Sequence, residues 1–213
     1  MREDMRLIQR GLIGLGLDPG PVDGLWGPKT KAALIALLAR SEAPPKAAAA
    51  SPAPSTRPML YQGAARHPVR EIVVHCSDTA TNWYQGLSAQ AKRGEIRRWH
   101  TDPAPKGNGW RDIGYHWLID RDGTLLTGRL ETEIGAGVAG HNQGVIHICL
   151  IGGRGGNERD AFSKHFTPAQ DRTVRDLIDA IGMRTQIQRV SGHNEHAAKA
   201  CPCFNVPAWL KEA

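Results

Sequence analysis

Residues 73–79 read Val73-Val74-His75-Cys76-Ser77-Asp78-Thr79, an apolar run that ends in a histidine and a cysteine. A second segment, Ser191 to Pro202, adds two more histidines and another cysteine. The apolar run predicts a buried strand, and a side chain at the end of a strand can project into a cleft while the strand fixes its backbone. We therefore expect the two segments to meet at one site in an α/β fold.

The side chains in these two segments are of the types that bind zinc. Two imidazoles and one thiolate give three protein ligands, the number typical of a catalytic zinc site, because the fourth position stays open to water or substrate. His75, His193 and Cys201 form one such set, but His196 and Cys203 stand at neighbouring spacing. Spacing alone leaves four combinations open, and each of them predicts a hydrolase.

Length and composition limit the rest of the molecule. The 213 residues, 40% of them hydrophobic, allow one ordinary domain plus a small accessory unit. The chain has no apolar run of about 18 residues, and acidic residues stand near its start where a signal peptide needs bases. We expect a protein that is made in the host cytoplasm without a signal peptide and is not inserted in a membrane.

Charge and cysteine content narrow the partners. The 27 Lys and Arg exceed the 21 Asp and Glu, giving a net charge of +6 that favours polyanions, and an anionic cell-wall polymer fits. We expect no nucleic acid partner, because the basic residues are scattered without an aromatic-basic motif, and we expect a monomer. In a reducing compartment the four cysteines are expected to serve a metal or the core rather than disulfides.

Three regions differ in composition. Residues 1–40 contain two helical patterns, with Pro28 at a first helical position, separated by a turn-rich loop that carries Trp26. Residues 41–68 are rich in Ala and Pro, which predicts an extended tether. Residues 69–213 form the larger domain. There we expect strands at 69–75, 115–120, 124–127 and 145–151, with helices at 94–100 and from the capping box at Thr167 to a stop at Gly182.

Tyr115 and Lys199 are further candidates for chemistry. Tyr115 starts a strand after a glycine, and Lys199 stands two residues before Cys201. Taken alone, such a tyrosine is usually a core aromatic and such a lysine is usually solvated. Beside a zinc ion, however, both could donate hydrogen bonds to a developing oxyanion.

The N-terminal loop resembles a known domain. Gly20-Pro21-Val22-Asp23-Gly24-Leu25-Trp26-Gly27-Pro28-Lys29-Thr30 is similar to the core of the three-helix peptidoglycan-binding domain of wall hydrolases, over about Asp18 to Thr30. The resemblance implies that residues 1–40 form a small all-α unit that binds peptidoglycan. For Trp26 itself, packing in the core of the unit is an equally good interpretation.

The larger domain resembles the zinc N-acetylmuramoyl-L-alanine amidases, over roughly Val69 to Leu210. The chain looks like the small phage lysozymes of amidase type, which are relatives of the animal peptidoglycan recognition proteins. Eight segments occur in the family's order, at residues 75–79, 95–100, 109–116, 121–124, 128–129, 149–153, 166–170 and 199–202. The resemblance implies a mixed central sheet flanked by helices.

The resemblance also implies an activity and assigns roles. The family's zinc ligands fall on His75, His193 and Cys201, and its catalytic pair on Tyr115 and Lys199. The expected reaction is endolysin-like hydrolysis of the amide bond between N-acetylmuramic acid and L-alanine by a zinc-activated water, with the N-terminal unit holding peptidoglycan nearby.

Four residues are candidates for substrate binding: Trp99, His100, Trp110 and Arg129. Tryptophan rings can stack on the apolar faces of sugars, although Trp99 shares a helical face with Ile96 and equally suits core packing. The chain departs from its relatives at residues 135–142, where phage members have a histidine before the Gly-x-Asn turn, and at 145–149, where Val-Ile-His-Ile-Cys replaces Ser-Ile-Gly-Val-Cys. His141 and His147 thus have no assigned role.

Two other functions compete with this one. A recycling amidase that acts on anhydro-muropeptides would have the same fold, but those relatives tend to use Asp as the third ligand. A sensor that binds peptidoglycan without cutting it would lack the ligand cysteine. Cys201, the catalytic pair and the wall-binding unit favour a cutting enzyme that acts on the wall.

Overall fold

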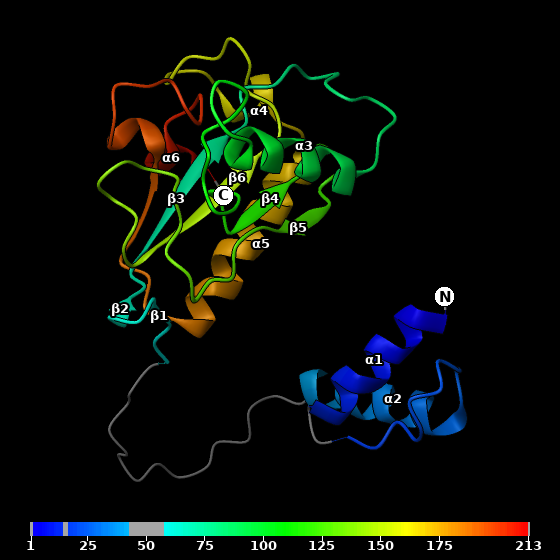
Figure 1. Ribbon diagram of the computed structural model, residues 1–213. Helices are drawn as coiled ribbons and strands as arrows, with labels where there is room; N and C mark the ends of the chain where they lie inside the picture. Colours follow the sequence, from blue (N-terminus) through cyan, green and yellow to red (C-terminus); the bar gives the residue numbers. More distant parts are fainter. Residues whose placement is uncertain (1, 15–16, 43–57, 213) are drawn as a thin grey trace, which may run out of the picture. The chain divides into compact units, whose positions relative to one another are not determined.

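The computed structural model describes residues 2–14, 17–42 and 58–212 (Figure 1). The chain divides into two compact units, residues 1–55 and 56–213. No helix among the described residues is long and apolar enough to cross a membrane.

The first unit contains two helices, α1 (Arg2–Gly14) and α2 (Pro28–Glu42), in its described residues, not the three that the resemblance implied. The loop between them is organised by Gln9, which is 1% exposed. Its amide nitrogen donates to the Asp23 carboxylate at 3.0 Å and to the Thr30 hydroxyl at 3.2 Å, and its oxygen accepts from the Gly24 backbone at 2.9 Å. Because side-chain hydrogen bonds and turns close this segment, it needs no helix of its own.

Trp26 lies on the surface of this unit. It is 53% exposed, whereas Leu12 of α1 and Ala33 of α2 are buried, at 2% and 5% exposed. The interpretation of Trp26 as a core residue is therefore wrong.

The expected tether at residues 41–68 is structured at its described ends. Helix α2 continues to Glu42, and residues 58–68 contain a small antiparallel ribbon, β1 (Tyr61–Gln62) with β2 (His67–Pro68). Gln62 is fully buried and bonds to the backbone of Gly144 and Val145 at 3.0 Å each, which attaches the ribbon to the second unit. Residues 43–57, the remainder of the expected tether, lie outside the described residues.

The second unit is built on a five-stranded mixed sheet in the order β5-β4-β6-β3-β7 (Figure 1). Strands β3 (Glu71–Cys76), β4 (Trp117–Ile119), β6 (Val145–Leu150) and β7 (Arg189–Gly192) run parallel, while β5 (Leu125–Thr127) is antiparallel to β4. The central strands β3 and β6 are buried on both faces, which explains their continuous apolar sequences. These findings confirm the mixed α/β fold.

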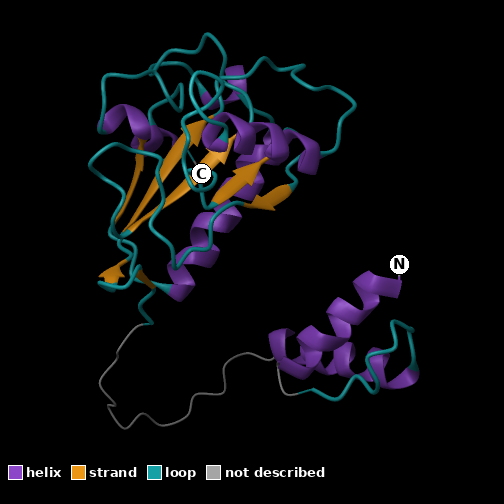
Figure 2. Cartoon of the chain, in the orientation of Figure 1, coloured by secondary structure: helices purple, strands orange, loops and turns teal. Residues whose placement is uncertain are grey.

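Helices cover both faces of the sheet (Figure 2). Helix α5 (Pro168–Arg184) packs with Val174 and Leu177 on the core that contains Ile148, while α3 (Ala89–Thr101) packs with Ile96 on the opposite core, which contains Cys149. The capping box at Thr167 is confirmed, but Gly182 does not stop α5, which ends at Arg184 with Thr185 as its C-cap. Helix α3 begins earlier than expected, because the Ser88 hydroxyl accepts from the Ala91 backbone and caps it.

Besides the β1–β2 ribbon, four short elements were not expected from the sequence: α4 (Phe162–His165), β7, the 3₁₀ helix η1 (His193–Glu195) and α6 (Val206–Trp209). Strand β7 pairs in parallel with β3, so the carboxyl ends of both strands lie at the same edge of the sheet. Strand β3 ends there with His75 and Cys76, and η1 follows β7 directly. The topology therefore brings the two histidine-cysteine segments together.

Candidate active site

Three side chains converge where β3 and β7 end. The Nδ1 atoms of His75 and His193 lie 3.2 Å apart, and the Cys201 Sγ lies 3.9 Å from the His75 Nδ1. One ligand atom from each residue lies within 4.8 Å of the other two. His75 is fixed by the buried strand, His193 by η1, and Cys201 by a hydrogen bond from the Cys76 backbone to its Sγ at 3.2 Å.

The donor set fits a divalent metal ion. Zinc bonds of about 2.0–2.1 Å to two nitrogens place them about 3.3 Å apart at a tetrahedral centre, close to the separation of the two Nδ1 atoms. Burial lowers the pKa of His75 well below its usual value, and burial together with the Lys199 charge lowers the pKa of His193. Both rings are therefore neutral at neutral pH and can offer lone pairs, as metal ligation requires.

The rival ligands face other partners. The His196 Nε2 lies 3.1 Å from the Glu71 carboxylate and 3.0 Å from the Ser191 hydroxyl. The Cys203 thiol donates to the Gly153 carbonyl at 3.1 Å and lies 3.6 Å from the Cys76 sulfur. All four cysteines are free thiols. Neither rival belongs to the group of converging ligand atoms.

Tyr115 and Lys199 line the same open pocket of about 550 Å³ as His193 and Cys201. The Tyr115 ring packs against the His75 ring, with centroids 5.1 Å apart. Burial raises the pKa of Tyr115 well above its usual value, so its hydroxyl keeps its proton and can act as a hydrogen-bond donor. Lys199 is exposed and brings a positive charge to the pocket.

The four substrate-binding candidates separate into different roles. Trp110 is 37% exposed and lines a second pocket with His193 and Lys199. His100 lies behind it, with its ring stacked on Trp110 at 4.9 Å and 5.2 Å from the Tyr115 ring. Burial and the Arg129 charge lower the pKa of His100 to about 4, so it is a neutral support for these two rings.

Trp99 and Arg129 face inward instead. Trp99 packs against the buried cluster of Ile96, and its Nε1 donates to the Glu95 carboxylate at 2.9 Å. Arg129 is 9% exposed and donates to the carbonyls of Asp112, Ile113 and Ile134 at 3.1, 2.6 and 2.8 Å. Because its donors bond to backbone carbonyls, Arg129 ties two loops together, and its expected role in substrate binding stays a prediction.

His147 contacts the metal-binding group, and sequence reasoning left it without a role. It is fully buried in β6, and its Nδ1 lies 3.0 Å from the His75 Nε2. If the His75 Nδ1 ligates a metal, the His75 Nε2 must carry the ring proton, and it then donates a hydrogen bond to the His147 Nδ1. That contact fixes the orientation of the His75 ring. The absence of a side chain at Gly137 provides the space for this contact, since a Cβ there would lie 2.6 Å from the His147 Nδ1.

Replacing His147 with leucine should weaken metal binding about ten- to hundredfold, because the acceptor that orients His75 is lost. Competition with a chelating dye measures this affinity. His147→Asn is the matched variant, since its amide oxygen can accept the same hydrogen bond and should recover much of the loss. Equal metal affinity in wild type and His147→Leu would show that the contact does not orient the ligand.

Comparison with known proteins shows which families the chain matches. Residues 65–204 match the family model of N-acetylmuramoyl-L-alanine amidase, and residues 1–37 match that of a putative peptidoglycan binding domain. The endolysin of Escherichia phage T7 is 37% identical over 141 residues, which cover 66% of this chain and 85% of the relative. The endolysin of Klebsiella phage KP32 is 35% identical over 147 residues, which cover 69% and 89%.

Solved structures share the fold. The amidase LysC from Clostridium intestinale superposes with a TM-score of 0.52 at 23% identity, covering 67% of this chain and 83% of that one. Bumblebee PGRP-SA superposes with a TM-score of 0.55 at 24% identity, covering 73% and 86%. The arrangement of the sheet and its helices is therefore that of these proteins.

Proposed function

The chain belongs to the N-acetylmuramoyl-L-alanine amidase family and is a peptidoglycan hydrolase, and on that premise we propose that its site cleaves the amide bond between N-acetylmuramic acid and L-alanine with a zinc ion held by His75, His193 and Cys201. The observation that carries this assignment is the convergence of two neutral imidazoles and a thiol, His75, His193 and Cys201, of which the latter two line one pocket with Tyr115 and Lys199. We expect the protein to act on the cell wall as a monomer.

The residues around the site have different roles in the proposed reaction. A bound zinc ion would supply a water of lowered pKa and polarise the scissile carbonyl. The Tyr115 hydroxyl, which keeps its proton, donates a hydrogen bond to the oxygen that becomes negative in the transition state. The Lys199 ammonium stabilises the same charge from the exposed rim. The leaving amino group needs a proton, and Tyr115 and Lys199, which both line the pocket, can donate it.

Residues 1–40 are assigned to holding peptidoglycan, and residues 69–213 to catalysis. The first unit matches the binding-domain model and presents Leu25 and Trp26 at its surface, 50% and 53% exposed. Binding through such a unit raises the local concentration of scissile bonds without any new contact in the active site.

The Trp26 side chain should matter for insoluble substrate only. Trp26→Ala is expected to lower binding to purified sacculi several-fold, because stacking on sugar rings is lost, while cleavage of a small soluble muropeptide stays unchanged. Co-sedimentation with sacculi measures the first and product chromatography the second. Ile35→Ala is the matched control, since Ile35 is a similarly exposed apolar residue of the same unit, at 56%. Equal sedimentation of wild type, Trp26→Ala and Ile35→Ala would show that Trp26 does not contribute to binding.

Mass spectrometry of digested sacculi tests the proposed reaction. Amide hydrolysis should release stem peptides with new N-terminal L-alanine and leave the glycan chains intact, and a chelator should stop the release until zinc is restored. New reducing sugar ends would indicate a glycosidase. Binding of sacculi without any release would indicate a sensor.

A further inference from the structure

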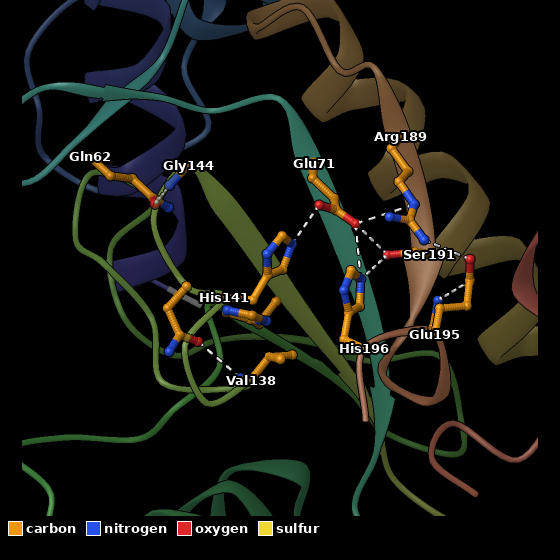
Figure 3. Close-up of polar contacts among 12 residues, drawn as sticks. Gln62, Glu71, Val138, His141, Gly144, Arg189, Ser191, Glu195 and His196 are labelled. Carbon is orange, nitrogen blue, oxygen red and sulfur yellow. Dashed lines mark hydrogen bonds and ion pairs between the residues drawn. The ribbon is translucent and has the colours of Figure 1, made fainter. Parts of the chain in front are cut away.

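A second group of ligand-type side chains lies beside β3 (Figure 3). It consists of Glu71, His141 and His196, and it is called the rim cluster below. The Glu71 carboxylate lies 2.7 Å from the His141 Nε2 and 3.1 Å from the His196 Nε2. One ligand atom from each of the three residues lies within 4.8 Å of the other two.

The rim cluster is separate from the active site. Glu71 and His75 point to the same face of β3 and stand four residues apart, so about 13 Å of strand divides them. Val73, which lies between them on that face, packs with Val138 and Val145 in a small buried cluster. An ion in one group therefore cannot be shared with the other.

Three different segments supply the rim cluster. Glu71 begins β3, and His196 caps the end of η1. His141 belongs to a loop that is closed by hydrogen bonds from the His141 backbone to the Val138 carbonyl and from the Val138 backbone to the Asn142 side chain, at 3.1 and 2.9 Å. The Ser191 hydroxyl donates to the Glu71 carboxylate at 2.6 Å and holds it in place (Figure 3).

We propose that the rim cluster is a second binding site for a divalent transition-metal ion of the zinc type, weaker than the active site. Two imidazoles and one carboxylate are a ligand set that such ions accept, with open positions left for water. Ligands at about 2.0–2.2 Å from one ion stand about 2.9–3.4 Å apart. Here the His141 Nε2 lies 2.7 Å from the Glu71 Oε2 and the His196 Nε2 lies 3.1 Å from the Glu71 Oε1, so small shifts would bring the carboxylate and both rings around one ion. The His141 and His196 rings stack at 4.3 Å with an interplanar angle of 21°, so binding would tilt them until the two Nε2 lone pairs converge.

The charges around the rim cluster set its strength. Burial by itself would raise the pKa of Glu71, but hydrogen bonds from Ser191 and His141 outweigh it and hold that pKa below its usual value, so the carboxylate is an anion at neutral pH. Arg189 opposes a cation, with its Nε 3.6 Å from the same carboxylate, although its guanidinium also donates to Glu195 at 2.9 Å. The active site also has a cation nearby, the exposed Lys199, but it contributes a thiolate in place of a carboxylate, and thiolate is the softer ligand that zinc prefers, so the active site should fill first.

A metal ion bound in the rim cluster would connect the loop of His141 to η1. The loop of His141 includes Val138, Ala139 and Asn142, which line the second pocket, and η1 carries His193. An ion bound to His141 and His196 would fasten this loop to η1. Binding would therefore raise the melting temperature, by an amount that grows with metal concentration.

The test is a zinc count on the full chain after equilibrium dialysis, with elemental analysis. Wild type should bind two equivalents, and His141→Ala should bind one while it still cleaves sacculi. His67→Ala, which removes a histidine of β2 outside the rim cluster, is the matched control and should keep two. Arg189→Gln should tighten the second equivalent several-fold, because a nearby positive charge is removed.

Cobalt distinguishes the two sites. Cobalt in the active site should give a near-ultraviolet charge-transfer band from Cys201, whereas cobalt in the rim cluster should add only visible absorption, which Glu71→Gln and His141→Ala should each remove. One equivalent in wild type, or two in both rim variants, would overturn the proposal and leave the rim cluster as a hydrogen-bonded loop clasp. Since the cleavage assay is separate, either result leaves the amidase assignment to its own test.

Discussion

Replacing Cys201 with alanine should abolish amide cleavage while the chain stays folded. The thiol is one of three ligand atoms at the site, and its removal leaves two imidazoles without the anionic donor that offsets the charge of the ion. A polarised carbonyl and an activated water together lower the barrier by several kcal/mol, so cleavage should fall by at least about a thousandfold. Release of stem peptide from sacculi measures this loss, and the cobalt charge-transfer band should disappear with it.

Cys203→Ala is the matched control for that experiment. Cys203 lies two residues further on, but its thiol bonds to the Gly153 carbonyl and is not one of the three converging ligand atoms. This variant should keep the cobalt band and most of the cleavage, and circular dichroism of both variants reports on folding. Cleavage that survives Cys201→Ala but is lost in Cys203→Ala would reverse the assignment of the ligand.

The sequence predicted the elements whose residues are buried on both faces. The runs at 69–75 and 145–151 are continuously apolar because β3 and β6 lie in the middle of the sheet. Strand β7 was missed because it lies at the edge and contains Arg189, Ser191 and Gly192 in four residues. Its place depends on pairing with a strand more than a hundred residues away, which local patterns do not encode.

The sequence predicted which residue types form the candidate site, but it did not predict which way each side chain points. Spacing left His196 as an alternative to His193, because only the 3₁₀ turn decides that His193 faces the Cys201 sulfur and His196 faces Glu71. His147 had no assignable role until the parallel register placed it beside His75. Arg129 suited a groove by its charge, but the three carbonyls that surround it come together only in the folded chain.

Replacing Tyr115 with phenylalanine should lower kcat about a hundred- to a thousandfold and leave KM and metal affinity nearly unchanged. The variant keeps the ring that packs against His75 and removes only the hydroxyl, so the metal site should stay intact. The stated loss is typical for removal of one donor to a developing oxyanion. Tyr84→Phe is the matched control, because Tyr84 is a partly exposed tyrosine, at 38%, that does not line the pocket.

The pH dependence of the Tyr115→Phe variant distinguishes two roles for Tyr115: a protonated hydrogen-bond donor and an ionised base. Burial raises the pKa of Tyr115, so the hydroxyl is protonated below that raised value and loses its proton only as pH climbs beyond the usual range for tyrosine, about 10. The ratio of wild-type to Tyr115→Phe activity should therefore stay constant from neutral pH to about 9. A ratio that rises with pH would mean that ionised Tyr115 does the work as a base. An unchanged kcat in Tyr115→Phe would leave Lys199 as the donor that stabilises the oxyanion, and Lys199→Met would then have to show the loss.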